Sequence, residues 1–171
     1  SNDYVQVGTS GSIGLSGECT VEAWIKVPSS VPDGTRVGII LGNNNYSPHF
    51  NFEVITLGRL RIYWNGGQID MSSTGIDVRD DAWHHVAMVR DQSAYSMKMY
   101  IDGNLNNSSS AGTNLDIQWP LRFGDDFRNG TSPAVPFNGM IDEVRVWNTA
   151  RTQTEIQANM NSAPEESETG L

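Results

Sequence analysis

The sequence predicts an all-β fold, an antiparallel two-sheet jelly-roll sandwich that ends in a short C-terminal helix. Short runs of alternating apolar and polar residues recur along the chain, and turn-forming residues separate them. The composition agrees, because 171 residues include 17 Gly and 7 Pro, with 37% hydrophobic and only 18% charged residues. Many short strands at regular spacing, bounded by turn residues, are typical of sandwiches and jelly rolls.

The expected strands follow from these runs. In chain order they cover residues 3–7, 19–27, 36–42, 49–56, 59–64, 68–73, 82–91, 96–102, 121–125 and 140–147. The segment IDGN, which follows the run that begins at Ser96, predicts a tight hairpin, because Asp-Gly tolerates positive φ.

Period-2 alternation assigns the two faces of each strand. In the strands over 49–56 and 59–64, large apolar residues alternate with polar and aromatic ones. The residues on the second face are His49, Asn51, Glu53, Arg61 and Tyr63. We therefore expect one face toward the core and one mixed polar and aromatic face.

One helix is expected over residues 152–160. Thr152 and Glu155 stand at the spacing of a capping box, and Ile156 and Met160 lie four residues apart on one side. This helix is the last element of the predicted domain.

The domain is expected to cover residues 1–162, and the acidic, Pro-containing stretch 163–171 is expected to be a linker or tail. A strand-like run begins almost at once, so we expect the chain to be part of a larger, multidomain protein. No apolar run reaches the length of a membrane span, which predicts no membrane insertion.

Charge and cysteine content exclude some classes of partner. The net charge of −9 argues against nucleic acid, because neutralising phosphates requires clustered Lys and Arg. It is compatible with cations or neutral ligands. The single cysteine, Cys19, cannot form an internal disulfide and is expected to be a small buried hydrophobic residue.

The pair His84-His85 raises the question of a metal site. Adjacent residues of a strand point to opposite faces, so they cannot both reach one ion. The third histidine, His49, lies far away in the sequence, and no HExxH or CxxC spacing occurs. We expect one imidazole to be hydrogen-bonded inside and the other to lie at a strand edge.

Four segments together resemble the laminin G-like family of the concanavalin A-like jelly rolls, in its bacterial, pentraxin-related branch. They are TVEAWIK, DAWHHVAMVRD, MKMYIDGN and FNGMIDEVRVWNTARTQTEIQ, and the resemblance covers about residues 3–160. It implies the concanavalin A-like fold and structural roles for Trp24, Trp83 and Trp147. The family contains lectins, carbohydrate-binding modules, adhesion modules and domains appended to hydrolases, so the fold does not supply the function.

Catalysis is not expected. Glycoside hydrolysis needs two carboxylates that flank the bond, and the E-x-D-x-x-E pattern of laminarinase-like relatives is absent. No nucleophile elbow occurs either. A divergent glycoside hydrolase stays an alternative, because Glu22 and Glu53 could share a polar face across strands.

The resemblance also implies a structural calcium ion as a cofactor. Asp142 matches the family's Asp near the start of the last strand, and Asp3 and Gly17 lie where further ligands are expected. Calcium takes six to eight oxygens, many from backbone carbonyls. The alternative is that Asp142 only caps a hairpin or pairs with an Arg. The pairs Asp80-Asp81 and Asp125-Asp126 are expected to be solvated turns, with a second calcium site at Asp125-Asp126 as an alternative.

The expected ligand site lies on the polar face and its adjoining loop. Sugar sites combine aromatic surfaces with polar groups that bind hydroxyls. The candidate residues are Asn44, Asn45, Tyr46, His49, Asn51, Glu53, Arg61 and Tyr63, and Trp119 is a further one. The alternative is an ordinary solvated sheet face.

These observations together predict a non-catalytic binding module of a larger secreted or cell-surface protein, with carbohydrate recognition as its function. The expected partner is a glycan or an extracellular protein. A structural or protein-binding adhesion spacer stays the competing interpretation.

Overall fold

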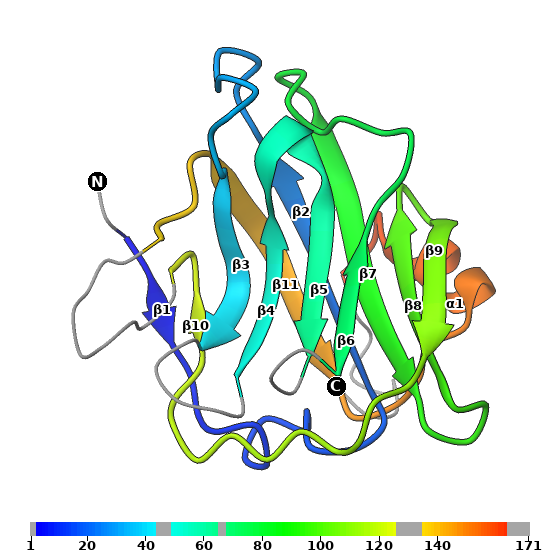
Figure 1. Ribbon diagram of the computed structural model, residues 1–171. Coiled ribbons are helices and arrows are strands. Elements are labelled where there is room, and N and C mark those ends of the chain that lie inside the picture. Colours follow the sequence, from blue (N-terminus) through cyan, green and yellow to red (C-terminus); the bar gives the residue numbers. More distant parts are fainter. Residues whose placement is uncertain (1–2, 44–48, 65–67, 126–134, 164–171) are drawn as a thin grey trace.

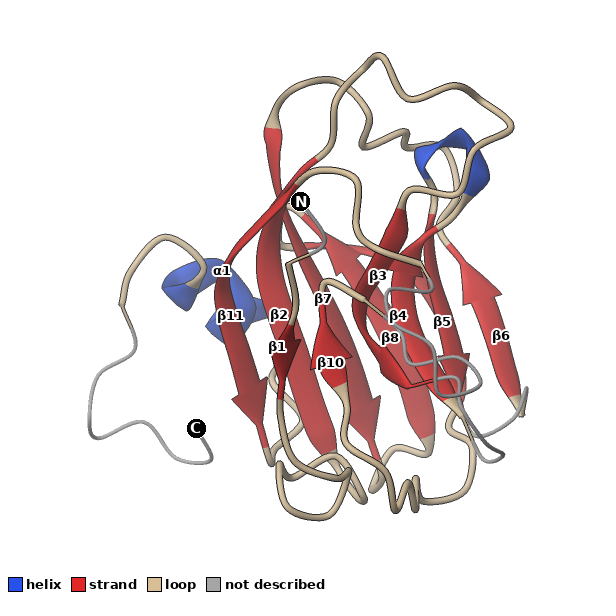
Figure 2. Cartoon of the chain, turned by 90° about the vertical axis from the view of Figure 1, so that its left-hand side faces the viewer, coloured by secondary structure: helices blue, strands red, loops and turns tan. Residues whose placement is uncertain are grey.

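The computed structural model describes residues 3–43, 49–64, 68–125 and 135–163. Two antiparallel sheets face each other, and one short helix lies outside the second sheet (Figures 1 and 2). This architecture confirms the predicted jelly-roll sandwich. Of the expected tail 163–171, all but residue 163 lies outside the described residues.

The first sheet has six strands in the order β1-β10-β3-β4-β5-β6. Their bounds are β1 Val5–Gln6, β3 Gly38–Asn43, β4 Phe50–Val54, β5 Leu60–Trp64, β6 Ile69–Ser72 and β10 Arg122–Phe123. A 3-10 turn, η1 (Thr56–Gly58), connects β4 to β5.

The second sheet has five strands in the order β11-β2-β7-β8-β9. Their bounds are β2 Cys19–Lys26, β7 Trp83–Asp91, β8 Ser96–Ile101, β9 Asn104–Ser110 and β11 Met140–Trp147. The edge strand β11 is irregular, because its register with β2 shifts between Asp142 and Arg145 and Glu143 adopts a positive φ of 49°.

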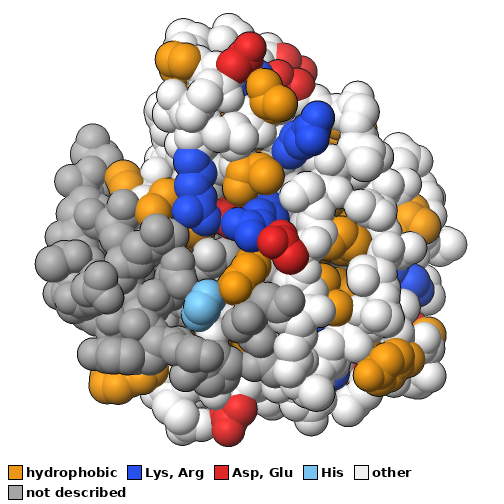
Figure 3. All heavy atoms as spheres, viewed as in Figure 1, with side chains coloured by type: hydrophobic (Ala, Val, Ile, Leu, Met, Phe, Trp, Pro, Cys, Tyr) orange, Lys and Arg blue, Asp and Glu red, His pale blue; other side chains and the backbone are white. Residues whose placement is uncertain are grey.

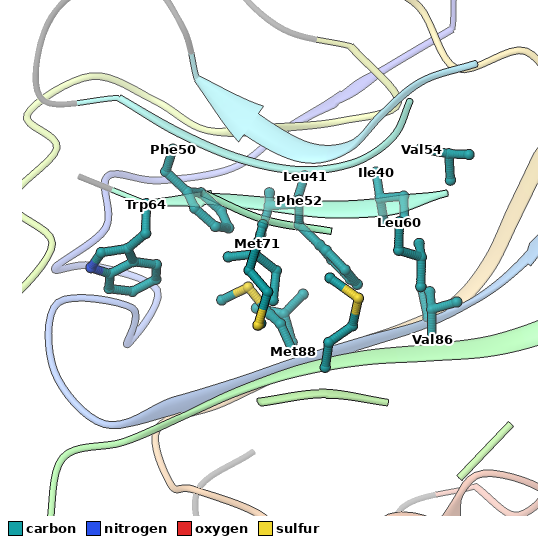
Figure 4. Packing of buried hydrophobic residues seen from close by; sticks show 14 of the residues in the cluster. Ile40, Leu41, Phe50, Phe52, Val54, Leu60, Trp64, Met71, Val86 and Met88 are labelled. Carbon is teal, nitrogen blue, oxygen red and sulfur yellow. The ribbon is translucent and has the colours of Figure 1, made fainter. Parts of the chain in front are cut away.

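The core fills the space between the sheets. Phe50 and Phe52 of β4 point inward with Trp64 of β5, toward Met88 and Val86 of β7 (Figure 4). All five side chains are buried, as the alternation predicts. Burying large side chains of this kind stabilises the fold by about 1.5–3 kcal/mol each.

The helix α1 (Gln153–Asn159) covers the outer face of the five-stranded sheet. Thr152 and Glu155 form the predicted capping box, and Ile156 packs on Ala87 and Val89 of β7. No helix in the described ranges is long and apolar enough to cross a membrane. The outer face of the six-stranded sheet carries no helix among the residues that the structure describes.

Two of the three tryptophans assigned to the scaffold are held by hydrogen bonds. Trp147 is buried and its Nε1 donates to Glu22 at 2.6 Å, while Nε1 of Trp24 donates to the carbonyl of Met160 at 2.8 Å. Trp83 differs, because it is 40% exposed at the start of β7. The structural roles expected of Trp24 and Trp147 fit these contacts.

The two adjacent histidines point to opposite faces, as predicted. His85 is buried, with Nε2 at 3.3 Å from Glu22. His84 lies at the rim, with Nδ1 at 2.9 Å from Asp102 and Nε2 at 3.1 Å from Asp80. Burial disfavours its protonated form, but the hydrogen bonds to Asp102 and Asp80 outweigh this effect and raise the pKa of His84.

Cys19 is fully buried in the core, as predicted. Burial raises the pKa of its thiol to about 12, although nearby Arg90 opposes this shift. The thiol is therefore a packing group with no nucleophilic character at neutral pH.

The IDGN hairpin forms as predicted, with Asp102 and Gly103 at φ 50° and 71°. The strand after it, β9, was not predicted. Its sequence NLNNSSS has no apolar alternation, and most of its side chains are exposed. An exposed edge strand buries no face, so hydrophobic periodicity cannot reveal it.

Amide side chains tie β9 to the other sheet. Asn106 donates from Nδ2 to the carbonyl of Thr74 at 3.0 Å and accepts from the Thr74 N–H at 2.9 Å. Nδ2 of Asn107 donates to the carbonyl of Ser72 at 2.8 Å. These side chains replace a backbone ladder and close one side of the sandwich between β6 and β9.

Candidate functional site

The open outer face of the six-stranded sheet gathers the polar residues predicted from the alternation. In the register of β4 and β5, Asn51 lies opposite Tyr63 and Glu53 lies opposite Arg61. His49 stands just before β4 and stacks on Tyr63. The predicted Asn44, Asn45 and Tyr46 lie outside the described residues.

A charged cluster of Arg36, Glu53, Arg61 and Asp70 occupies the middle of this face. Glu53 is 0% exposed, and it accepts hydrogen bonds from Arg36 and from Nη1 of Arg61. Arg61 also donates from Nε and Nη2 to the two carboxylate oxygens of Asp70, both at 2.7 Å. Figure 3 shows Lys/Arg and Asp/Glu side chains together over the middle of this face, beside a histidine.

These contacts fix the charge states of the exposed pair. The hydrogen bonds from Arg61 lower the pKa of the Asp70 carboxyl, although partial burial opposes this shift. The same hydrogen bonds raise the pKa of Arg61. Both groups are therefore ionised over the whole physiological pH range.

Tyr63 lies between two neighbours on the same face. Its ring stacks on His49 with centroids 5.0 Å apart and planes at 12°, and the guanidinium carbon of Arg61 lies 4.8 Å from its centroid. The expectation that Asn51 and Glu53 contact ligand needs correction, since both are buried. They support the surface, and the partly exposed side chains are Arg61, Tyr63 and His49.

A half-exposed tryptophan stands at the end of the same sheet. Trp119 is 49% exposed, and the next residue, Pro120, accepts a hydrogen bond from Nδ2 of Asn43. Asn43 pairs with Phe50, the neighbour of His49. Trp119 therefore lies close to the His49 end of the polar face.

Sequence reasoning missed two members of the charged cluster. Arg36 follows the turn PDGT and looks like an ordinary solvated residue, while Asp70 lies in the short run QIDMSS. Period-2 alternation does place Asp70 opposite the apolar Ile69 and Met71, which was the available signal. For Arg36 the sequence holds no comparable signal.

The three predicted calcium ligands do not come together. The Gly17 carbonyl accepts a hydrogen bond from Nη1 of Arg90 at 2.7 Å. Asp142 pairs with Trp24 near the far end of β2, about 16 Å of strand from Cys19. Gly17, two residues before Cys19, therefore lies too far from Asp142 for both to bind one ion.

Asp142 and Asp3 lie on the same side of the sandwich but in different surroundings. Asp142 is exposed and accepts from the backbone N–H of Glu143 at 2.8 Å. Asp3 lines a groove of about 300 Å³ together with Phe123 and Ile141. No group of three metal-ligating side chains that could hold an ion occurs among the described residues.

The acidic pairs behave differently from each other. Asp80 and Asp81 are exposed, as expected of a solvated turn. Asp125 is only 1% exposed, so this expectation is wrong for it. Its Oδ1 accepts from the N–H of Val135 at 3.0 Å, and its Oδ2 lies 3.7 Å from Arg122. Asp126 lies outside the described residues.

The structure does not bring together Glu22 and Glu53, the two carboxylates of the alternative hydrolase interpretation. Glu22 is in β2 of the five-stranded sheet and Glu53 is in β4 of the six-stranded sheet, each on the side away from the core. The whole sandwich separates them, so they cannot flank one glycosidic bond.

Comparisons with known proteins agree with this fold. The family model described as the concanavalin A-like lectin/glucanases superfamily, of laminin G type, matches residues 1–157. The sushi, von Willebrand factor type A, EGF and pentraxin domain-containing protein 1 of Rattus norvegicus is 24% identical over 156 residues, 86% of this chain. The chain spans only 4% of the length of that protein.

Solved structures show the same architecture. A candidate carbohydrate-binding protein from Bacteroides ovatus aligns with a TM-score of 0.73 at 23% identity, over 100% of this chain and 48% of that one. The CBM40 module of the Ruminococcus gnavus IT-sialidase aligns with a TM-score of 0.70 at 16% identity, over 94% of this chain and 97% of the module. That module has also been solved bound to α2,3-sialyllactose. With sheets, helix and family model in agreement, the chain belongs to the laminin G-like family of the concanavalin A-like lectin/glucanases superfamily.

Proposed function

We propose that this chain is a carbohydrate-binding module of a larger secreted or cell-surface protein, and that sugar hydroxyls bind over Arg61, Asp70 and the Tyr63–His49 stack. One observation carries the proposal. On the sheet face that no described helix covers, Arg61 is held in place by two carboxylates before any ligand arrives. A side chain that is already ordered loses little entropy on binding.

The cluster also has unused hydrogen-bonding capacity of the kind that hydroxyls need. A guanidinium has five N–H groups, and Arg61 spends three of them on Glu53 and Asp70. Each Asp70 oxygen accepts one bond from Arg61 and has a second lone pair, and the side chain is 51% exposed. Donor and acceptor sites therefore lie side by side, as pairs of sugar hydroxyls require.

The same contacts favour binding over hydrolysis. A glycosidase needs one carboxyl group with a raised pKa to act as the acid. The pKa of Asp70 is lowered by Arg61, and Glu53 is buried between two arginines. Asp70 is thus held as an anion and Glu53 is buried away from any ligand, which supports a non-catalytic role. The carbohydrate-binding names of the Bacteroides and Ruminococcus structures give additional support.

A glycan array tests the proposal, with the wild-type domain beside Arg61→Ala and Tyr63→Ala. We expect the two variants to lose most of the binding of the wild type. Lys98→Ala is the matched control, because Lys98 lies on β8 of the other sheet and pairs with Asp91. If the folded wild type binds no glycan, the adhesion spacer becomes the better interpretation.

We propose separately that a structural calcium ion binds near Asp142 and Asp3. The Asp142 and Asp3 carboxylates would supply part of an oxygen shell that calcium completes with backbone carbonyls and water. Because Gly17 lies at the other end of β2 from Asp142, the remaining ligands would have to come from elsewhere.

A further inference from the structure

We infer, on the basis of the proposed function, that the site selects uncharged glycans and that Asp70 is the residue that excludes carboxylated sugars such as sialic acids. Three features of the cluster support this: its charges, the hydrogen bonds that Arg61 already makes to Asp70, and the exposure of the Asp70 side chain.

The charges of the cluster cancel. Arg36 and Arg61 contribute two positive charges, and Glu53 and Asp70 contribute two negative ones. Glu53 is buried against both arginines, so its charge cannot turn away from them. The four groups of the cluster therefore offer an anionic ligand no net positive charge, and the chain as a whole carries −9.

Asp70 already takes the position that a ligand carboxylate would need. Arginine recognises carboxylates through two parallel N–H···O bonds, and Arg61 makes such a pair with Asp70 at 2.7 Å for each bond. A carboxylated sugar would have to displace Asp70 and then lie beside its ionised side chain. A hydroxyl needs neither step, because it can add to the existing pair.

Exposure shows which group a ligand would meet first. The Asp70 side chain is 51% exposed, whereas that of Arg61 is 25% exposed. The carboxylate is therefore the more prominent member of the pair, and it accepts hydrogen bonds from hydroxyls and repels anions. Neutral sugars fit this arrangement.

The test compares glycans that share one core with and without a terminal sialic acid, bound to the wild type and to Asp70→Asn. The asparagine keeps the size of the side chain but removes the charge. We expect the wild type to prefer the neutral member of each pair. In Asp70→Asn the ratio of sialylated to neutral binding should rise about tenfold, which corresponds to about 1.4 kcal/mol. Asp70→Ser repeats the test with a smaller side chain.

Asp91→Asn supplies the matched control. Asp91 is also a carboxylate paired with a cation, Lys98, but it lies in the other sheet. Asp91→Asn should leave the ratio unchanged. Preference of the wild type for sialylated glycans, or an unchanged ratio in both Asp70 variants, would overturn this inference while leaving the proposed function intact. Absence of binding to every glycan by the folded wild type would overturn both.

Discussion

Replacing Arg90 by methionine should destabilise the domain by about 3 kcal/mol. Arg90 is 2% exposed, and its guanidinium donates to the carbonyls of Gly17 at 2.7 Å and Gly112 at 2.8 Å, and to Asn114 at 3.1 Å. It also lies 5.5 Å from the ring of Trp64 in the facing sheet. One side chain thus joins three segments that lie far apart in the sequence.

The magnitude follows from what each acceptor can do after the substitution. Gly112 is buried, so its carbonyl is left without a partner at a cost of about 1–3 kcal/mol. Gly17 and Asn114 are partly or fully exposed and can bind water, so each loses only about 0.5–1.5 kcal/mol. Release of a buried charge offsets part of this sum, which leaves about 3 kcal/mol.

Calorimetry and urea unfolding, followed by tryptophan fluorescence, measure the effect. For a domain of this size, 3 kcal/mol corresponds to a fall in Tm of about 6–12 °C. The exposed Arg59→Met makes the same chemical change and should alter stability by less than about 0.5 kcal/mol. If Arg90→Met melts with the wild type, the desolvation penalty of the buried charge outweighs its hydrogen bonds, and Arg90 does not stabilise the fold.

Three further predictions concern other parts of the fold. The pKa of His84 is raised in the folded state, so its contribution to stability is full below about pH 6.5 and is lost as the pH rises through the folded-state pKa. Urea midpoints between pH 5 and 9 should show this loss in the wild type and not in His84→Gln. Asn106→Ala removes both bonds to Thr74 and should cost about 1–2 kcal/mol in urea unfolding, whereas Ser108→Ala on the same exposed strand should cost almost nothing. Millimolar calcium should raise Tm by several degrees, because a hundredfold excess over Kd adds about 2.7 kcal/mol, and the rise should be absent in Asp142→Ala. Identical melts with EDTA and with calcium would exclude the ion.

Alternation allowed the sequence to predict the core strands and the polar face. Phe50 and Phe52 recur at period 2, and a strand that buries one face cannot slip by one residue without exposing them. The same periodicity placed Arg61 and Tyr63 together on the other face. Their assignment needed no knowledge of the neighbouring strands.

The features that the sequence did not reveal depend on contacts between distant segments. Arg36 binds Glu53 from the segment just before β3, and nothing local distinguishes it from a solvated arginine. Asp125 is buried because Arg122 and the backbone of Val135 satisfy it. Backbone carbonyls leave no mark in a sequence, so the occupation of the Gly17 carbonyl by Arg90 could not be foreseen either.

The amides that join β9 to the segment around Thr74 carry a consequence for maturation. Asn106 and Asn107 each begin an Asn-x-Ser sequence, the acceptor pattern for N-glycosylation. In both residues the nitrogen that would carry the sugar is Nδ2, which here donates to the carbonyls of Thr74 and Ser72. In a cell with the glycosylation machinery, an oligosaccharyltransferase could reach these nitrogens only before β9 docks. A glycan at either position would therefore show that the chain was modified before this side of the sandwich closed.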